Sequence, residues 1–191
     1  MGSLVVFIFE YFLEDILKFT ETELHGAFII EIEKIKDKRG FFARSWCQNE
    51  FKTHGLTPRV VQANISYNKT KGTLRGMHYQ ISPYEESKLI RCTRGAVIDV
   101  IIDLRPDSDT YTKWISVDLT ADNYKMIFVP EGFAHGFQTL SDNTEIFYQV
   151  SQFYTPGSED GIRWNDPVFG IEWPIEVTAI SEKDMNWPDY K

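Results

Sequence analysis

The stretches Thr73-Leu-Arg-Gly-Met-His-Tyr-Gln80 and Pro130-Glu-Gly-Phe-Ala-His-Gly-Phe137 decide the fold of this chain. In each stretch apolar and polar residues alternate, and this alternation places neighbouring side chains on opposite faces of a β-strand. The first stretch delivers His78 and the second delivers His135. We therefore expect both imidazoles to face the interior of one barrel.

The second stretch has the spacing Pro-x-Gly-x-x-His, which resembles the second motif of the cupin barrels. The first motif of a metal-binding cupin supplies His-x-His and a carboxylate, but the residue two positions after His78 is Gln80. A neutral amide is a poor replacement for an imidazole at a borderline divalent metal. The resemblance therefore implies a cupin-like pocket without a metal or other cofactor, in which His78 is free to act as a base.

Short β-rich runs, separated by turn residues, fill the chain from Gly26 onward. Strands are expected over residues 27–32, 41–46, 59–66, 73–80, 87–93, 96–104, 113–119, 125–129, 134–140 and 144–153, and helical turns over 49–53 and 181–186. Strands at this spacing, with hardly a helical window between them, predict an all-β, cupin-like jelly-roll barrel with short C-terminal helical segments. After Pro156 the chain is irregular and rich in Trp, Asp and Pro, so we expect it to cross a mouth of the barrel and return carboxylates to the pocket.

The first twenty residues contain the apolar run Leu4-Val-Val-Phe-Ile-Phe9. This run is shorter than the ~20 residues of a membrane span, and it lacks the basic leader and cleavage site of a signal peptide. We interpret residues 1–20 as an N-terminal extension that forms an extra strand or a short helix docked on the barrel or on a partner subunit. Residues 21–191 are expected to form one domain, because this length supports one sizeable core.

The composition of the chain argues against some classes of function and indicates a cellular compartment. The net charge of −8 argues against a general nucleic-acid surface, because phosphate backbones are bound through clustered Lys and Arg. Two cysteines, Cys47 and Cys92, are too few for a disulfide framework and fit a reducing compartment. We therefore expect a cytoplasmic protein that binds neither nucleic acid nor membrane.

Several motifs stand in the order of one known family. They are Arg75-Gly-Met-His78, Lys88-Leu-Ile-Arg91, Asp99-Val-Ile-Ile-Asp103-Leu-Arg105, Pro130-Glu-Gly-Phe-Ala-His135 and Ser181-Glu-Lys-Asp184. Together they resemble the dTDP-4-dehydrorhamnose 3,5-epimerase family over about residues 22–188. The resemblance implies a cofactor-free isomerase of a nucleotide-linked 4-keto-6-deoxy sugar, most directly dTDP-4-dehydro-6-deoxy-D-glucose. Inversion at C3 and C5 would give dTDP-4-dehydro-L-rhamnose, a precursor for deoxysugars of cell-surface polysaccharide.

A pocket with an unligated histidine, a lysine and arginines suits proton abstraction next to a carbonyl. His78 is the candidate base, since Arg75 and Lys88 near it are unusual around an ordinary core histidine. A carboxylate is expected to fix the tautomer of this base. Spacing alone leaves both Asp166 and Asp184 open for that role.

The resemblance assigns the remaining catalytic roles. It favours Asp184, because the dyad aspartate of the family stands in a late Ser-x-Lys-Asp segment. It implies that Tyr148 returns a proton on the opposite face of the sugar and that Lys88 stabilises the enolate. On pattern alone, Tyr148 is equally well explained as an aromatic of a half-buried strand, and Lys88 as a solvated surface lysine.

The resemblance also implies eight substrate-binding residues, namely Arg39, Gln62, Asn64, Arg75, His135, Tyr154, Glu159 and Lys183. The planar fork of arginine suits a diphosphate, and a thymine stacks on a tyrosine ring. Two positions depart from the family pattern. Arg44 stands where relatives commonly carry an acidic residue, and Ala63 replaces the Asp of the usual Gln-Asp-Asn. These departures leave the exact nucleotide and sugar open.

Three other functions compete with this interpretation. A single-centre epimerase of a related deoxysugar pathway would use the same dyad. A metal-dependent cupin enzyme would contain stoichiometric iron, manganese or zinc. A non-catalytic sugar-binding barrel would have lost the dyad or the tyrosine, and this sequence retains His78, Asp184 and Tyr148. We also expect a homodimer, because exposed apolar and aromatic strand residues leave surface for a second copy to cover.

Overall fold

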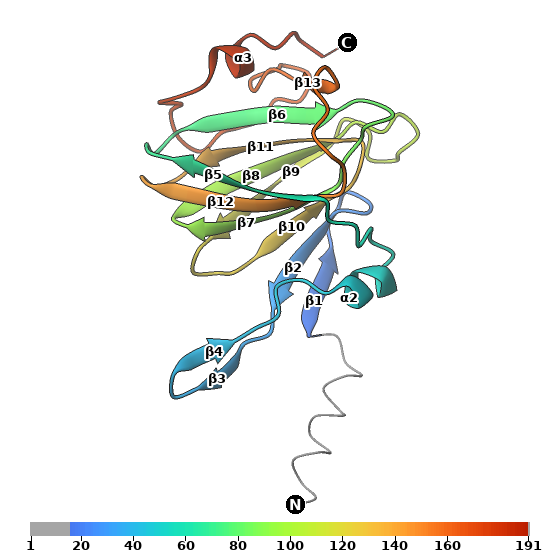
Figure 1. Ribbon diagram of the computed structural model, residues 1–191. Helices are drawn as coiled ribbons and strands as arrows, with labels where there is room; N and C mark the ends of the chain where they lie inside the picture. Colours follow the sequence, from blue (N-terminus) through green and yellow to red (C-terminus); the bar gives the residue numbers. More distant parts are fainter. Residues whose placement is uncertain (1–15, 191) are drawn as a thin grey trace, which may run out of the picture.

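The structure is a computed structural model that describes residues 16–190 (Figure 1). The apolar run from Leu4 to Phe9, which we expected to dock on the barrel or on a partner, lies outside the described residues. No helix in the described part of the chain is long and apolar enough to cross a membrane.

Two antiparallel sheets face each other (Figure 1). The first contains, in spatial order, β1 (Leu17–Glu21), β2 (Phe28–Ile32), β10 (Met126–Val129), β7 (Lys88–Arg94), β12 (Thr144–Val150) and β5 (Gln62–Asn68). The second contains β13 (Glu159–Gly161), β6 (Leu74–Gln80), β11 (Phe133–Thr139), β8 (Ala96–Asp103) and β9 (Trp114–Thr120). The prediction of an all-β, cupin-like jelly roll is confirmed.

Inward-facing side chains of both sheets form the main core. Ile90 and Ile146 of the first sheet meet Ile101 and Leu119 of the second, and all four are fully buried. Burial of an aliphatic side chain of this size contributes about 1.5–3 kcal/mol. The β-branched and apolar residues that predicted the strands are therefore the residues that hold the sheets together.

A two-stranded arm, β3 (Ile35–Asp37) and β4 (Gly40–Phe42), projects away from the barrel (Figure 1). Every residue of both strands is exposed, and Phe42 has an exposed fraction of 72%. The strand expected over residues 41–46 was wrong in extent, because β4 has only β3 to pair with and the chain leaves it after Phe42. A short helix, α2 (Gln48–Thr53), follows at the predicted position.

The C-terminal segment lies along the β6 edge of the second sheet (Figure 1). After β13 the chain runs through turns to the second short helix, α3 (Glu182–Met185), at the predicted position. The side chain of Trp187 packs directly on Gly161, where a Cβ would overlap the indole. This contact requires glycine in β13 and seats the indole beside His78, whose ring lies 6.4 Å away between centroids.

Candidate active site

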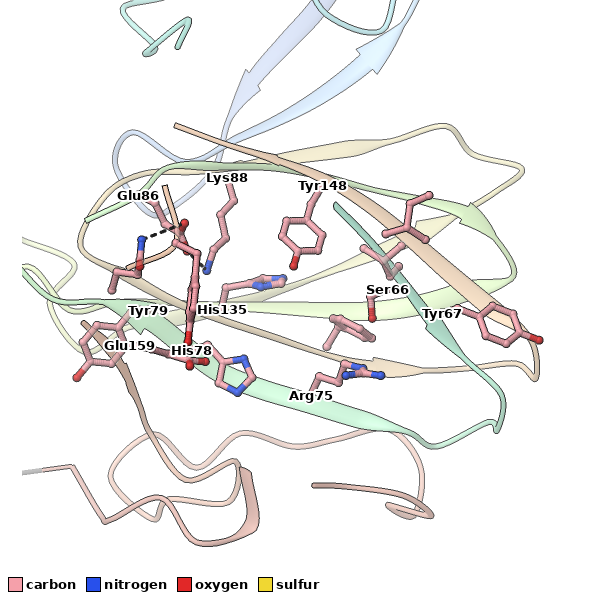
Figure 2. Close-up of a pocket in the computed structure, with 15 residues that line it drawn as sticks. Ser66, Tyr67, Arg75, His78, Tyr79, Glu86, Lys88, His135, Tyr148 and Glu159 are labelled. Carbon is pink, nitrogen blue, oxygen red and sulfur yellow. Dashed lines mark hydrogen bonds and ion pairs between the residues drawn. The ribbon is translucent and has the colours of Figure 1, made fainter. Parts of the chain in front are cut away.

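A pocket of about 430 Å³ opens between the two sheets (Figure 2). Its lining residues are Ile65, Ser66, Tyr67, Arg75, His78, Tyr79, Gln80, Glu86, Lys88, His135, Phe137, Ile146, Tyr148, Tyr154 and Glu159. Phe137 and Ile146 also belong to the main core, so the pocket rests on the packed interior of the barrel. Seven of the twelve predicted site residues, Arg75, His78, Lys88, His135, Tyr148, Tyr154 and Glu159, line this pocket.

His78 in β6 is joined to Asp184 in α3. Nε2 of the imidazole lies 2.6 Å from Oδ1 of the carboxylate, and the other oxygen accepts a bond from the Gly76 amide at 3.3 Å. Burial raises the pKa of Asp184, but the bonds from His78, Gly76 and the Ser181 region outweigh it and hold the pKa below its usual value. An ionised Asp184 fixes the proton on Nε2, so Nδ1 of His78 is the nitrogen available to accept another.

Asp166, the other aspartate that spacing left open, lies elsewhere. Its Oδ1 accepts a bond from the Val168 amide at 2.8 Å, and its Oδ2 accepts one from the Tyr190 amide at 2.6 Å. These bonds close the turn at Pro167 and fasten the C-terminal segment. The structure therefore brings Asp184, and not Asp166, to His78.

A second imidazole–carboxylate pair lies next to the first. His135 in β11 is the register partner of His78, and its Nε2 lies 2.9 Å from Oδ2 of Asp99 in β8. Asp99 is fully buried, and its other oxygen has no hydrogen-bond partner among the described residues. Asp99 was not among the site residues predicted from the sequence. A charged residue in the middle of the apolar run Val97–Ile102 was the available signal, because such a residue is buried only with a partner.

Lys88 in β7 and Tyr148 in β12 form the opposite wall of the pocket (Figure 2). Burial, and then the negative charge of Glu86, raise the pKa of Tyr148, while Arg75 lowers it. The phenol is therefore protonated at neutral pH. A hydroxyl on one sheet and an imidazole on the other face the same cavity from two sides.

The predicted binding residues on the pocket rim hold one another in place. Tyr154 is exposed on the loop after β12, and its backbone amide donates to Oε1 of Gln62 at 2.7 Å. Lys183 forms an ion pair with Glu159. On the wall, Nε of Arg75 donates to Oδ1 of Asn68 at 2.8 Å, which leaves the far end of the guanidinium for a ligand.

Two predicted binding residues on β5, Gln62 and Asn64, do not line the pocket, although Asn64 is the register partner of Tyr148. Arg39 is far from it, because it lies on the projecting arm and pairs with Asp37 (Figure 1). Arg44, the first departure from the family pattern, pairs with Glu50 at 2.6 Å. This ion pair is structural, since Glu50 also accepts the Leu17 amide of β1 at 2.8 Å.

Gln80, at the position of a cupin metal ligand, holds two loops together. Its amide nitrogen lies within 3.0–3.3 Å of the Tyr84 carbonyl, Glu86 and the Phe153 carbonyl. Its oxygen accepts from the Thr155 amide at 2.9 Å and from Ser158 at 3.0 Å. No group of three or more His, Cys, Asp and Glu residues in the described part of the chain is arranged to hold a metal ion.

The fold and this pocket define a cupin-like barrel whose cavity has an imidazole–carboxylate pair on one wall and a phenol on the other, an arrangement suited to proton transfer. The family model described as dTDP-4-dehydrorhamnose 3,5-epimerase matches residues 21–191. The chain belongs to the dTDP-4-dehydrorhamnose 3,5-epimerase family. The predictions of the family and of an epimerase are thus confirmed.

Relatives of this family resemble the chain over most of its length. The dTDP-4-dehydrorhamnose 3,5-epimerase of Shigella flexneri is 44% identical over 167 residues, which are 87% of this chain and 92% of that protein. The Bacillus anthracis epimerase, solved with TDP and PPi bound, is 40% identical with a TM-score of 0.88, over 91% of this chain and 99% of that one. The Legionella pneumophila epimerase, solved with dTDP-4-keto-L-rhamnose, is 35% identical with a TM-score of 0.82, over 92% and 99%.

Proposed function

We propose that this protein inverts C3 and C5 of dTDP-4-dehydro-6-deoxy-D-glucose and releases dTDP-4-dehydro-L-rhamnose. The observation that carries the proposal is the pairing of His78 with Asp184 on one wall of a pocket that has Tyr148 on the other. The relatives are named as dTDP-4-dehydrorhamnose 3,5-epimerases, and one of them was solved with dTDP-4-keto-L-rhamnose bound. The pocket of about 430 Å³ is large enough for a hexose and part of its diphosphate.

His78 acts as the base in this proposal. The carbon next to the C4 ketone loses its proton to Nδ1, the C–H electrons form a C=C bond, and the ketone oxygen becomes an enolate. Asp184 stabilises the imidazolium that results, since it is ionised and 2.6 Å away. Lys88 places an ammonium against the enolate oxygen, where positive charge lowers the barrier most.

Tyr148 completes the inversion from the other sheet. Its phenol gives a proton to the carbon on the face opposite His78, and the enolate electrons return to the ketone. The raised pKa of Tyr148 keeps the phenol protonated before each turnover. Proton removal from one side and delivery from the other invert the centre. Once His78 has lost its extra proton to solvent and Tyr148 has regained one from it, repetition at the second carbon gives the doubly inverted sugar.

The nucleotide part is bound toward the pocket rim in this proposal. Arg75 and His135 meet the diphosphate, with Lys183 held at the rim by Glu159. Tyr154 offers an exposed ring for the thymine, on a loop that Gln62 fixes, and Asn64 lies opposite Tyr148 on the neighbouring strand. A base stacked on an aromatic ring contributes about 1–3 kcal/mol.

A homodimer accounts for the position of Arg39. The arm that carries it exposes Ile35, Phe41 and Phe42, and an apolar surface of this kind needs cover. We propose that each arm docks on a second copy and brings Arg39 to the pocket of that copy. Sedimentation at micromolar protein concentration should show a dimer, and a single monomeric species would contradict the proposal.

The remaining assignments follow from the same site. Residues 21–191 are proposed as one catalytic domain and residues 1–20 as its extension, with β1 joining the two. The free thiols Cys47 and Cys92 support a cytoplasmic location. We propose that catalysis needs no metal, because Gln80 stands where a cupin ligand is required. Turnover should survive EDTA, and activity that is lost in EDTA and restored by a divalent ion would favour a metal-dependent cupin enzyme.

The test of the reaction is incubation with dTDP-4-dehydro-6-deoxy-D-glucose in heavy water, followed by proton NMR of the sugar. Deuterium should enter at both C3 and C5, and the couplings should change to those of the inverted product. Deuterium at one centre alone would identify a single-centre epimerase. No exchange at either centre would contradict the proposed function.

A further inference from the structure

Glu86 is an acidic side chain inside a pocket that, by the proposed function, receives an anionic substrate. It stands two residues before the start of β7 and lines the cavity, and its side chain is 14% exposed. Its Oε1 lies 3.1 Å from Nζ of Lys88, and its Oε2 accepts a bond from Nε2 of Gln80 at 3.3 Å. Figure 2 shows the carboxylate and the ammonium on the same wall. Both carboxylate oxygens therefore have fixed partners.

The position of this carboxylate requires an explanation. A negative charge here repels a diphosphate, and moving a carboxylate out of water carries a free-energy penalty that its ion pair must offset. Lys88, in contrast, gains a defined geometry. Its side chain has four rotatable bonds, yet it is held at 10% exposure with the ammonium beside the cavity. A cation fixed before the reaction stabilises a developing oxyanion without reorganising at the moment of reaction.

The support of Glu86 is itself rigid. Gln80 is 4% exposed. The two hydrogens of its amide nitrogen are shared among Glu86 and the carbonyls of Tyr84 and Phe153, and its oxygen accepts from the Thr155 amide and Ser158, so these contacts hold the amide in one orientation. The following residue, Ser87, donates its backbone amide to Oγ of Ser151 at 2.8 Å in a buried site. The carboxylate is thus fixed from its backbone and from its side chain.

We propose that Glu86 is a positioning residue for the epimerisation: its carboxylate, held by Gln80, anchors the ammonium of Lys88 where the enolate oxygen forms. This inference rests on the proposed function. It assigns the amide of Gln80 a use that differs from metal binding, because the amide holds the carboxylate that holds the lysine. In this proposal Lys88 contacts the substrate, and Glu86 does not.

The carboxylate of Glu86 also raises the pKa of Tyr148, the proposed acid on the opposite face of the sugar. Arg75, His78, Lys88, His135, Glu86 and Glu159 share the pocket with Tyr148. After burial, the charge of Glu86 is the main cause of the raised pKa of Tyr148, Glu159 adds to it, and Arg75 opposes it. A Glu86→Gln change removes one raising cause, so the phenol ionises at a lower pH. Activity that needs the protonated phenol is then lost at a lower pH as well.

The first test compares Glu86→Gln with Glu85→Gln, a neighbouring change at a residue that does not line the pocket. Loss of one charge-assisted contact should lower kcat of the Glu86 variant roughly 10–100-fold, with dTDP affinity unchanged or tighter. Its alkaline limb of kcat should also move to lower pH, while Glu85→Gln stays like wild type. A raised KM with normal kcat would overturn the proposal, because it would make Glu86 a binding residue.

A double-mutant cycle asks whether the effect passes through Lys88. In a Lys88→Ala background, Glu86→Gln should lower the residual deuterium exchange no further, since the group that it positions is gone. An equal loss in both backgrounds would overturn the proposal. Glu86→Asp keeps the charge and should recover most of the kcat. If the kcat of Glu86→Asp is as low as that of Glu86→Gln, the proposal is overturned, because the negative charge is then not what supports kcat.

A third measurement does not depend on turnover, so it separates failure of this inference from failure of the proposed function. Acetic anhydride labels lysine amines, and peptide mass spectrometry reads the rate at Lys88 alone. Release of the ammonium in Glu86→Gln should raise that rate by up to about tenfold, while Glu86→Asp, which keeps the charge, should stay near the wild-type rate. An unchanged rate in folded Glu86→Gln protein would overturn the anchoring role, whatever reaction the enzyme performs.

Discussion

Asp103 and Asp184 are both buried carboxylates with lowered pKa values, but they lie in regions with different uses. Asp103 ends β8 and accepts bonds from Arg105 at 2.7 and 2.8 Å and from the hydroxyls of Ser108 and Thr110 at 2.6 Å each. Burial raises the pKa of Asp103, but these donors bring it down to about 2. Asp184 likewise keeps a lowered pKa against its own burial.

The difference lies in the partner. The guanidinium of Arg105 never gives up its proton in a protein, so the Asp103 cluster is closed and only fastens a turn. The partner of Asp184 is an imidazole, whose ring nitrogens can both accept and donate a proton, and its side chain is 30% exposed. A lowered carboxylate pKa therefore does not by itself mark a catalytic group. A partner that exchanges protons and faces a cavity does.

The most severe test of this contrast is His78→Asn. Removal of the base should reduce deuterium entry at both C3 and C5 by at least ~10²–10⁴-fold, the range that general base catalysis supplies. NMR in heavy water measures the loss, and the thermal midpoint should change little because His78 is partly exposed. Retained exchange at either carbon would show that another group takes the proton.

Asp184→Asn should have the next largest effect. The imidazole remains but is less basic and less well held, so exchange should fall by roughly 10²-fold, the lower end of the same range. Asp166→Asn is the matched control, and it should act on stability through the turn at Pro167 without slowing exchange per folded molecule. If the Asp166 variant silences exchange in folded protein while the Asp184 variant does not, the assigned dyad is wrong.

Tyr148→Phe separates the two faces of the pocket. The base is kept, so exchange should slow by only about tenfold or less, while inverted product falls by roughly 10²-fold. The enolate is then reprotonated from the side that His78 occupies. Measuring deuterium content and product in one reaction gives both rates. Equal loss of exchange and product would mean that Tyr148 is needed for the first proton transfer.

Asp103→Asn should leave exchange unchanged and lower the free energy of unfolding by about 2 kcal/mol, the value of its pKa shift. The ionised Asp103 stabilises the folded state above the unfolded pKa near 3.8. This contribution is lost as the pH falls toward about 2. The free energy of unfolding measured in urea should therefore fall over that window in wild type, and it should fall less in the variant. A slower exchange rate in the folded variant would remove the distinction between the two carboxylates.

The fold was largely predictable, since alternation and turn residues report local strand structure. The exceptions depend on pairing. β13 has three residues and exists because it pairs with β6. The N-terminal extension was expected to form either an extra strand or a short helix, and pairing with β2 makes its last residues the strand β1. In the site, His78 and Tyr148 were found from their strands and from the family resemblance. Asp99 and Glu86 were missed, because their meaning comes from the side chain that they meet, and spacing along the chain does not reveal it. Arg39 does not line the pocket that contains His78, because the arm that carries it projects away from the barrel, and no local sequence pattern indicates this.

The dyad also sets an order of assembly. Asp184 lies 106 residues beyond His78, and β12 with its tyrosine lies between them. The ribosome therefore synthesises every strand of both sheets before the helix that carries the carboxylate. The proposed dyad is therefore complete only after α3 has been made, and we expect a chain cut short before α3 to lack the proposed activity.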